Sequence, residues 1–211
     1  MNHHEQLQDI KEIRSIMERS SRFLSLSGLS GVFAGIFALA GFTAAYFHFG
    51  LELSSSEYFE GAREPISPND SGFILFYFAD GLLVLVASLL AGFVFTARKA
   101  KKSGQKIWDA TARRMLINLM IPLTTGGIFC LILLFHGRLV LVAPATLIFY
   151  GLALINASKY TLNDIRYLGL MEIVLGLLAS VYVGYGLWFW ALGFGVLHII
   201  YGTVMYNKYE R

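Results

Sequence analysis

Cysteine and charged side chains are scarce in this sequence. Cys130 is the single cysteine, so an intrachain disulfide is excluded and the thiolate pairs of zinc and iron–sulfur sites are lacking. Only 15% of the 211 residues are charged, whereas 56% are hydrophobic and the mean hydropathy is +0.60. An ordinary soluble domain does not have these proportions. We therefore expect a polytopic membrane protein that holds no metal or other cofactor.

Several common catalytic and nucleotide-binding motifs are also lacking. The chain has no His-Glu-x-x-His, no histidine pair at helical spacing in an apolar segment, and no Gly-x-x-x-x-Gly-Lys-Ser/Thr loop. Its polar start shows no short apolar core followed by a cleavage site, so we expect no removable signal peptide. The formal charge of +3 comes from basic residues at the ends of apolar segments, which is no argument for nucleic acid. These absences do not favour an enzyme.

Six apolar segments are long enough to cross a bilayer as helices. Their approximate limits are 26–49, 73–97, 115–135, 139–157, 167–183 and 188–206. A polar loop over residues 50–72 follows the first segment, and short turns join the third to the fourth and the fifth to the sixth. We predict an all-α fold. Residues 26–207 would form a domain of six transmembrane helices, arranged as three antiparallel hairpins.

Residues 1–25 precede the first apolar segment. Apolar side chains recur at three- to four-residue steps from Leu7 to Leu24, and acids and bases fill the other faces. This pattern predicts an amphipathic helix on the cytoplasmic side. It would pack against the bundle, the lipid headgroups or a partner protein.

Basic residues lie almost entirely on one side of the predicted membrane. Of the 17 Lys and Arg residues, all but Arg63 and Arg138 fall in segments that share a side with the N-terminus. Because basic residues stay on the cytoplasmic side, both termini are expected in the cytoplasm, with the protein in the inner membrane. Besides the lipid bilayer, the expected partners are a cytoplasmic protein bound through residues 1–25 or 98–114, and further copies of the chain. The 21 glycines offer close-packing faces for such a homo-oligomer.

A faint internal repeat accompanies the six segments. The matched residues are Gly28, Leu29 and Gly35 with Gly169, Leu170 and Gly176, and Tyr150, Gly151 and Asn156 with Tyr201, Gly202 and Asn207. Tandem hairpins of similar design would explain these identities. Chance explains them equally well, since membrane segments draw on few residue types.

Glu172 and His198 are ionisable residues inside the last two apolar segments. Glu172 lies 14 residues before Gly186 and His198 lies 12 after it, so their depths differ by roughly 3 Å at ~1.5 Å per residue. Both share a helix face with small residues, and such faces pack against other helices in lipid. We expect Glu172 and His198 to face each other within the protein, either as a structural hydrogen bond or as part of a functional site.

The functional interpretation adds three polar residues to this pair. Asn118 and Asn156 lie at a similar depth, so they would line the same polar pocket, open to the cytoplasm. Asp80, nearer the outer surface, would be the outer element of a pathway, or would simply bond His48 or a neighbouring backbone. Because an adjacent carboxylate tunes histidine, such a pocket suits a proton or a small solute.

Two functions follow from these features. The first is a small-solute or ion transporter, or permeation unit, that uses the intramembrane Glu172 and His198 pocket. The second is a non-catalytic membrane sensor or regulatory subunit whose cytoplasmic segments bind a partner.

Residues 28–31 read Gly-Leu-Ser-Gly, and a small apolar stretch follows them. This segment resembles the nucleophile segment of rhomboid intramembrane proteases. The resemblance implies Ser30 as nucleophile and His198 as its base. Glu172 lies at a similar inner depth, and on chemical grounds it would orient the histidine. It covers about a dozen residues, lies in the first rather than the fourth helix, and lacks the family's outer-loop Trp-Arg pair. An intramembrane serine hydrolase is therefore a third, remote alternative.

Overall fold

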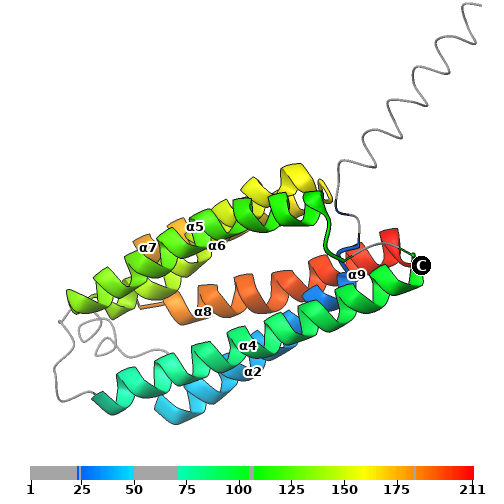
Figure 1. The fold of residues 1–211 in the computed structure, drawn as a ribbon. Coiled ribbons are helices and arrows are strands. Elements are labelled where there is room, and N and C mark those ends of the chain that lie inside the picture. Colours follow the sequence, from blue (N-terminus) through cyan, green and yellow to red (C-terminus); the bar gives the residue numbers. More distant parts are fainter. Residues whose placement is uncertain (1–22, 24, 50–70, 105–106, 183) are drawn as a thin grey trace, which may run out of the picture.

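The computed structural model describes residues 23, 25–49, 71–104, 107–182 and 184–211, and these residues form helices and their connections (Figure 1). The longer helices are α2 (Gly28–Phe49), α4 (Ser71–Lys102), α5 (Ala110–Phe135), α6 (Val142–Ala157) and α7 (Ile165–Val181). The last hydrophobic segment is one continuous rod made of α8 (Gly186–Trp190), the π-helical η4 (Ala191–Leu197) and α9 (His198–Tyr209). Short 3₁₀ turns, η2 (Leu139–Leu141) and η3 (Ser158–Tyr160), flank α6. The amphipathic helix predicted in residues 1–25 and the loop predicted at 50–72 lie almost entirely outside the described residues.

Most of these helices are long and apolar enough to cross a membrane. Five candidate spans occur among the described residues: Gly28–His48, Leu75–Lys102, Ala110–Phe135, Leu139–Tyr160 and Gly186–Tyr209. The 17 residues of α7 extend about 26 Å at ~1.5 Å per residue, slightly less than the ~30 Å hydrocarbon core. The chain is therefore an all-helical, multi-pass membrane protein.

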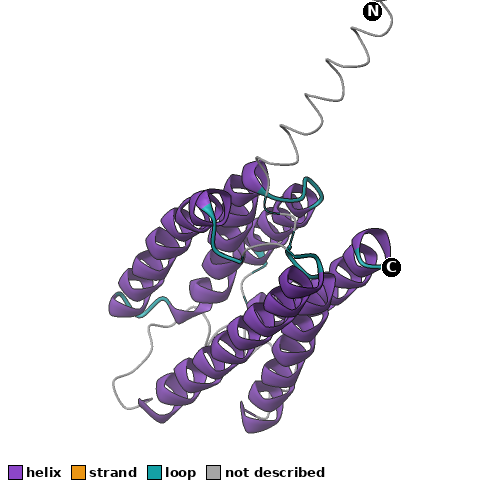
Figure 2. Cartoon of the chain, turned by 45° about the vertical axis from the view of Figure 1, so that its right-hand side comes forward, coloured by secondary structure: helices purple, strands orange, loops and turns teal. Residues whose placement is uncertain are grey.

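The helices pack in layers on either side of the α8–η4–α9 rod (Figures 1 and 2). α2 lies against α9 and η4 on one side and against α4 on the other. Beyond the rod, α6 packs between α7 and α5, and its contact with α7 is the most extensive between the described helices. α7 and the rod thus contact each other less than α7 contacts α6 and the rod contacts α2.

Several long helices run antiparallel to a neighbouring helix, as contacts between their ends show. The start of α2 meets the ends of α4 and α9, because Lys99 binds Leu26 and Glu210 binds Gly28. The end of α9 also meets the start of α7 through Asp164. We call this the basic end of the bundle, and its described Lys and Arg residues are Arg98, Lys99, Lys101, Lys102, Arg113, Arg114, Lys159, Arg166, Lys208 and Arg211. Among the described residues, the opposite end holds Arg138.

At the basic end, two helices extend further than their apolar segments indicate. α4 continues to Lys102, where Lys99, Lys101 and Lys102 form a basic last turn that suits the negative end of the helix dipole. α5 begins at Ala110 because Asp109 caps it, with Oδ1 accepting a hydrogen bond of 2.7 Å from the Ala112 backbone N–H. Hydropathy marks only the part of a helix within lipid, so it does not detect these polar turns.

Two helix pairs use glycines for close approach in the same way. In the α6–α7 pair, an added β-carbon at Gly151 would lie 2.5 Å from Gly169 O, and one at Gly169 would lie 2.7 Å from Gly151 O. In the α9–α2 pair, an added β-carbon at Gly202 would lie 2.6 Å from Gly28 O, and one at Gly28 would lie 2.5 Å from Gly202 O. These are the residues that the faint sequence repeat matches. The repeat therefore corresponds to two equivalent helix contacts, α6–α7 and α9–α2.

Candidate functional site

The candidate site lies where α6, α7 and the η4–α9 junction converge. Glu172 of α7 is completely buried, and His198, the first residue of α9, is 5% exposed. Leu147 of α6, also fully buried, packs beside Gly193, and Tyr150 follows one turn later. Glu172 Oε1 lies 3.4 Å from His198 Nδ1. The structure therefore brings Glu172 and His198 together, with a phenol from a third helix.

Both ring nitrogens of His198 have hydrogen-bonding partners. Nδ1 lies 2.9 Å from the Gly193 carbonyl oxygen, and Nε2 lies 2.9 Å from the Tyr150 hydroxyl oxygen. A carbonyl oxygen only accepts, so Nδ1 carries the proton. In the neutral ring Nε2 then accepts a hydrogen bond from the Tyr150 O–H. These two bonds hold the imidazole in one tautomer and one orientation.

The carboxyl group of Glu172 has no hydrogen-bonding partner among the described residues. Both oxygens are buried and unsatisfied, although Oε1 lies within ion-pair distance of His198 Nδ1. The two observations agree because the Nδ1 proton points to Gly193 O, which leaves an electrostatic contact with Glu172. A buried unsatisfied carboxyl group is costly, and in a membrane such groups mark functional sites.

A π-helical segment faces Glu172. Gly193 lies within η4, and its own carbonyl oxygen accepts the hydrogen bond from His198. A β-carbon at Gly193 would overlap both Glu172 Oε2 and Leu147 Cδ2, so a larger residue there would have to displace the ends of these two side chains. π-helical turns are rare and are often found at functional sites. The η4 segment is thus both π-helical and in direct contact with Glu172 and His198.

The two asparagines expected in the same pocket form a separate contact. Asn156 Nδ2 of α6 donates a hydrogen bond of 2.8 Å to the Asn118 backbone oxygen of α5. Asn118 Nδ2 in turn donates to Arg114 O one turn earlier in its own helix, at 2.9 Å. The first of these bonds links α5 to α6 near the basic end. The described hydrogen bonds do not join either asparagine to Glu172 or His198.

Asp80 lies in another layer of the bundle. It is in α4 and faces α2, where a β-carbon added to Gly41 would be 3.1 Å from Asp80 Oδ2. His48 stacks on Phe76 with 3.9 Å between the ring centroids. The described contacts do not include a hydrogen bond between Asp80 and His48.

Ser30 lies in the first turn of α2. Its Oγ donates a hydrogen bond of 2.5 Å to Ser27 O. The described hydrogen bonds do not connect Ser30 with His198, whose ring nitrogens bind Gly193 and Tyr150. The structure therefore does not assemble Ser30, His198 and Glu172 as a hydrogen-bonded row.

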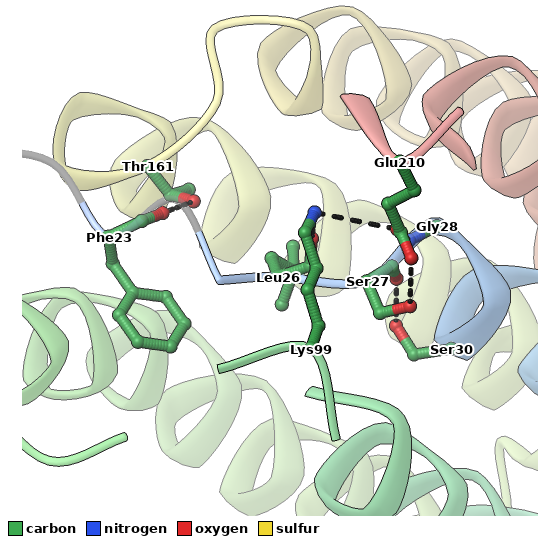
Figure 3. A network of polar contacts seen from close by, with 8 residues as sticks. All are labelled: Phe23, Leu26, Ser27, Gly28, Ser30, Lys99, Thr161 and Glu210. Carbon is green, nitrogen blue, oxygen red and sulfur yellow. Dashed lines mark hydrogen bonds and ion pairs between the residues drawn. The ribbon is translucent and has the colours of Figure 1, made fainter. Parts of the chain in front are cut away.

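A second polar cluster closes the basic end (Figure 3). Glu210, just beyond α9, accepts hydrogen bonds from Ser27 Oγ at 3.0 Å and from the Gly28 backbone N–H at 2.5 Å. Lys99 Nζ of α4 lies 3.4 Å from Glu210 Oε1 and donates a 2.7 Å bond to Leu26 O. A carboxylate at a helix N-terminus satisfies free N–H groups and the helix dipole. Glu210 therefore ties the ends of α2, α4 and α9 together.

Phe23 and the η3–α7 connection form a further link in the same cluster. Thr161 Oγ1 donates a hydrogen bond of 2.7 Å to Phe23 O, and Phe23 N–H donates one of 2.8 Å to Tyr160 O. Both Thr161 and Phe23 are buried. Phe23, which precedes α2, is thereby attached to the connection between η3 and α7.

Asp164 provides a pH-dependent contact between α7 and α9. Its Oδ2 accepts hydrogen bonds from Lys208 Nζ at 2.7 Å and from Tyr209 OH at 2.8 Å. The Lys208 hydrogen bond, aided by Tyr209 and opposed by partial burial, lowers the pKa of Asp164 below its ordinary 3.8. Because the folded pKa is the lower one, this contact stabilises the fold above pH 3.8 and is lost as the pH falls through the folded pKa.

Asp164→Asn is therefore expected to lower thermal stability at pH 7 and to have progressively less effect below about pH 4. Thermal unfolding of wild type and variant in the same detergent, across pH 3 to 7, measures the difference. Asp109→Asn is a useful comparison because it alters a helix cap for which the described contacts include no lysine. A difference between wild type and Asp164→Asn that stays constant over this range would contradict the assignment.

Two contributors to these sites were not expected from sequence. Tyr150 precedes Ala157 by seven residues and Glu172 follows Ile165 by seven, so their equal depth was a usable signal. Glu210 lies in a short polar tail, and only the fold brings it to α2.

Within the described residues, no group of three or more His, Cys, Asp or Glu side chains gathers as a metal site requires.

Comparison with protein-family models, with curated proteins and with solved structures found no match to this chain.

Proposed function

We propose that this protein is a small transporter or permeation unit for an ion or small solute, with a proton-binding site formed by Glu172, His198 and Tyr150. The observation that carries the proposal is the Glu172 carboxyl group, which is completely buried and unsatisfied 3.4 Å from His198 Nδ1. In a membrane bundle, an ionisable group in this state is a candidate site for proton or ion movement.

The pair can hold one proton in two ways. In one form Glu172 is protonated and His198 is neutral, and in the other an ionised Glu172 faces a protonated His198. Both forms leave the pair with no net charge. Removal of that proton leaves one charge without a partner in the protein interior, which low-dielectric surroundings penalise. The protonation state of the pair is thus coupled to how closely α7 and η4 pack.

The site's surroundings suit such coupling. Gly193 allows the carboxyl group to lie against the π-helical segment, and His198 links that segment to α6 through Tyr150. A change in the pair's charge would act on α6, α7 and α9 together. We place the basic end in the cytoplasm, because basic residues remain on that side.

A flux assay tests this proposal. Purified protein is reconstituted into liposomes that contain a pH-sensitive dye, and a potassium diffusion potential drives protons inward. Wild-type liposomes are expected to acidify faster than protein-free liposomes. Glu172→Gln, which keeps the shape but not the ionisable proton, is expected to reduce the rate to the protein-free value.

Ser180→Ala is the matched control, because Ser180 is also in α7 and its hydroxyl only binds Gly176 O in its own helix. It should keep the wild-type rate. Size-exclusion profiles and thermal stability must be the same for the three proteins. Acidification that is equal in wild type, Glu172→Gln and protein-free liposomes would overturn a proton pathway through this site.

A structural role in a non-catalytic membrane component is the competing proposal. It is favoured by the glycine contacts of α6–α7 and α9–α2, which pack the helices on both sides of the pair at backbone distance. In that case Glu172 and His198 only hold helices together. The apolar replacement described in the Discussion separates the two proposals.

A further inference from the structure

Three of the four basic side chains in the last turns of α4 have no acidic partner among the described residues. Lys99 is engaged by Glu210 and Leu26, whereas Arg98, Lys101 and Lys102 form no ion pair or hydrogen bond with other described residues. Arg98 lies over the Phe95 ring at 5.9 Å. All three free cations are exposed. This surface therefore has positive charge that the described residues do not neutralise.

Two of these cations line an open hollow. It has a volume of about 450 Å³ and is lined by Ala97, Arg98, Lys101 and Ile107. Ala97 and Lys101 are one turn apart on α4, and Ile107 comes from the connection to α5. The hollow is thus lined by two cationic and two apolar side chains.

An exposed apolar strip continues from this hollow along α4. Leu90 is 61% exposed and Val94 is 41% exposed. Leu90, Val94, Ala97 and Lys101 follow the spacing of a single helix face. From Lys101 back to Leu90 the strip is roughly 16 Å long at ~1.5 Å per residue. A positive site therefore leads directly onto a surface suited to a hydrocarbon chain.

The length of α4 places the hollow near the membrane surface. Its 32 residues extend about 48 Å at ~1.5 Å per residue, whereas the hydrocarbon core is ~30 Å thick. The apolar part of the helix ends before Arg98, so Arg98 and Lys101 lie at the depth of lipid phosphates. Basic clusters at this position attract anionic lipid.

We propose that the hollow binds the phosphate headgroup of an anionic phospholipid, with Arg98 and Lys101 contacting the phosphate and an acyl chain lying along Val94 and Leu90. Charge complementarity selects the headgroup, and the adjoining apolar strip selects a lipid over a soluble anion. The proposal is independent of proton binding at Glu172.

Native mass spectrometry of the full-length protein in detergent tests this inference. The protein is titrated with phosphatidylglycerol and, separately, with phosphatidylcholine of the same acyl chains. Wild type is expected to bind phosphatidylglycerol about 30-fold more tightly, because Arg98 and Lys101 each contribute about 1 kcal/mol near the membrane surface and about 1.4 kcal/mol corresponds to a factor of ten. The double variant Arg98→Gln/Lys101→Gln is expected to lose this preference.

Arg113→Gln/Arg114→Gln is the matched control, since it removes the same charge from exposed positions at the start of α5. It should retain the preference. Ala97→Trp fills the hollow without a change in charge and should also lose the preference, so it decides the test if the α4 double variant does not fold. Equal binding of both lipids by wild type, an equal loss in the α5 control, or displacement of the lipid by millimolar inorganic phosphate would overturn the proposal.

Discussion

His198→Ala is expected to be among the most destabilising single substitutions in this protein. It removes the partners of Tyr150 OH and Gly193 O, and it leaves the Glu172 carboxyl group buried with no imidazole beside it. Removal of one member of a buried pair typically costs about 3–5 kcal/mol. In a protein of this size the midpoint of thermal unfolding would fall by on the order of 10 °C.

Thermal unfolding in detergent measures this effect. Thr203→Ala is the control on the same helix, because Thr203 is exposed and its hydroxyl binds only Ile199 O. The prediction fails if His198→Ala lowers the midpoint no more than Thr203→Ala does.

An apolar replacement of the whole cluster tells a site from a structural contact. The triple variant Tyr150→Phe/Glu172→Leu/His198→Phe keeps similar volumes and leaves no ionisable or hydroxyl group. Buried ionic pairs are often replaced by hydrophobic residues with no loss of stability, so its unfolding midpoint should recover toward wild type. Under the proposed function this stable variant carries no proton flux. Wild-type flux from the same variant would show that the cluster only holds helices together.

Alanine at Gly202 and at Gly151 is expected to be destabilising to a similar extent. A β-carbon at Gly202 would lie 2.5 Å from Val32 N, and one at Gly151 would lie 2.5 Å from Gly169 O. Because these neighbours are backbone atoms, the two helices must move apart, and overpacking of this kind costs about 1–3 kcal/mol. The equal effect follows from the equivalence of the α9–α2 and α6–α7 contacts.

Gly127→Ala is the control for both variants. No atom outside its own helix lies within 4 Å of a β-carbon there, and alanine favours a helix over glycine by about 1 kcal/mol. Its unfolding midpoint in detergent should equal or exceed that of wild type. If the three alanine variants unfold at the same temperature, the close helix contacts do not control stability.

The helical class and the depth of the polar residues follow from the order of the amino acids. A long apolar segment crosses lipid as an α-helix, because every backbone N–H and C=O must form its hydrogen bond within the segment. Depth is then a matter of counting residues from a turn, and this count places Glu172 and His198 at one level. The same counting applied to Tyr150 would have found the third member of the cluster.

Helix rotation and the choice of neighbours depend on tertiary packing. Many helix faces carry small residues, so the sequence does not say that α9 packs mainly on α2 or that α7 packs mainly on α6. These choices decide whether polar residues at one depth meet. Asn118 and Asn156 contact each other on α5 and α6, and Asp80 faces α2, away from the Glu172 cluster.

The details of the cluster also depend on local geometry that hydropathy does not encode. The π-helical turn of η4 positions Gly193 O to accept from His198, which leaves Glu172 without a donor. Glu210 reaches α2 only because α9 ends beside the start of that helix. Composition and spacing are thus enough to predict an all-helical membrane bundle with an acid and an imidazole at one depth. Their meeting with Tyr150 at a π-helical turn emerges only from the folded bundle, because rotation and packing about each helix axis, unlike depth, depend on every neighbouring side chain.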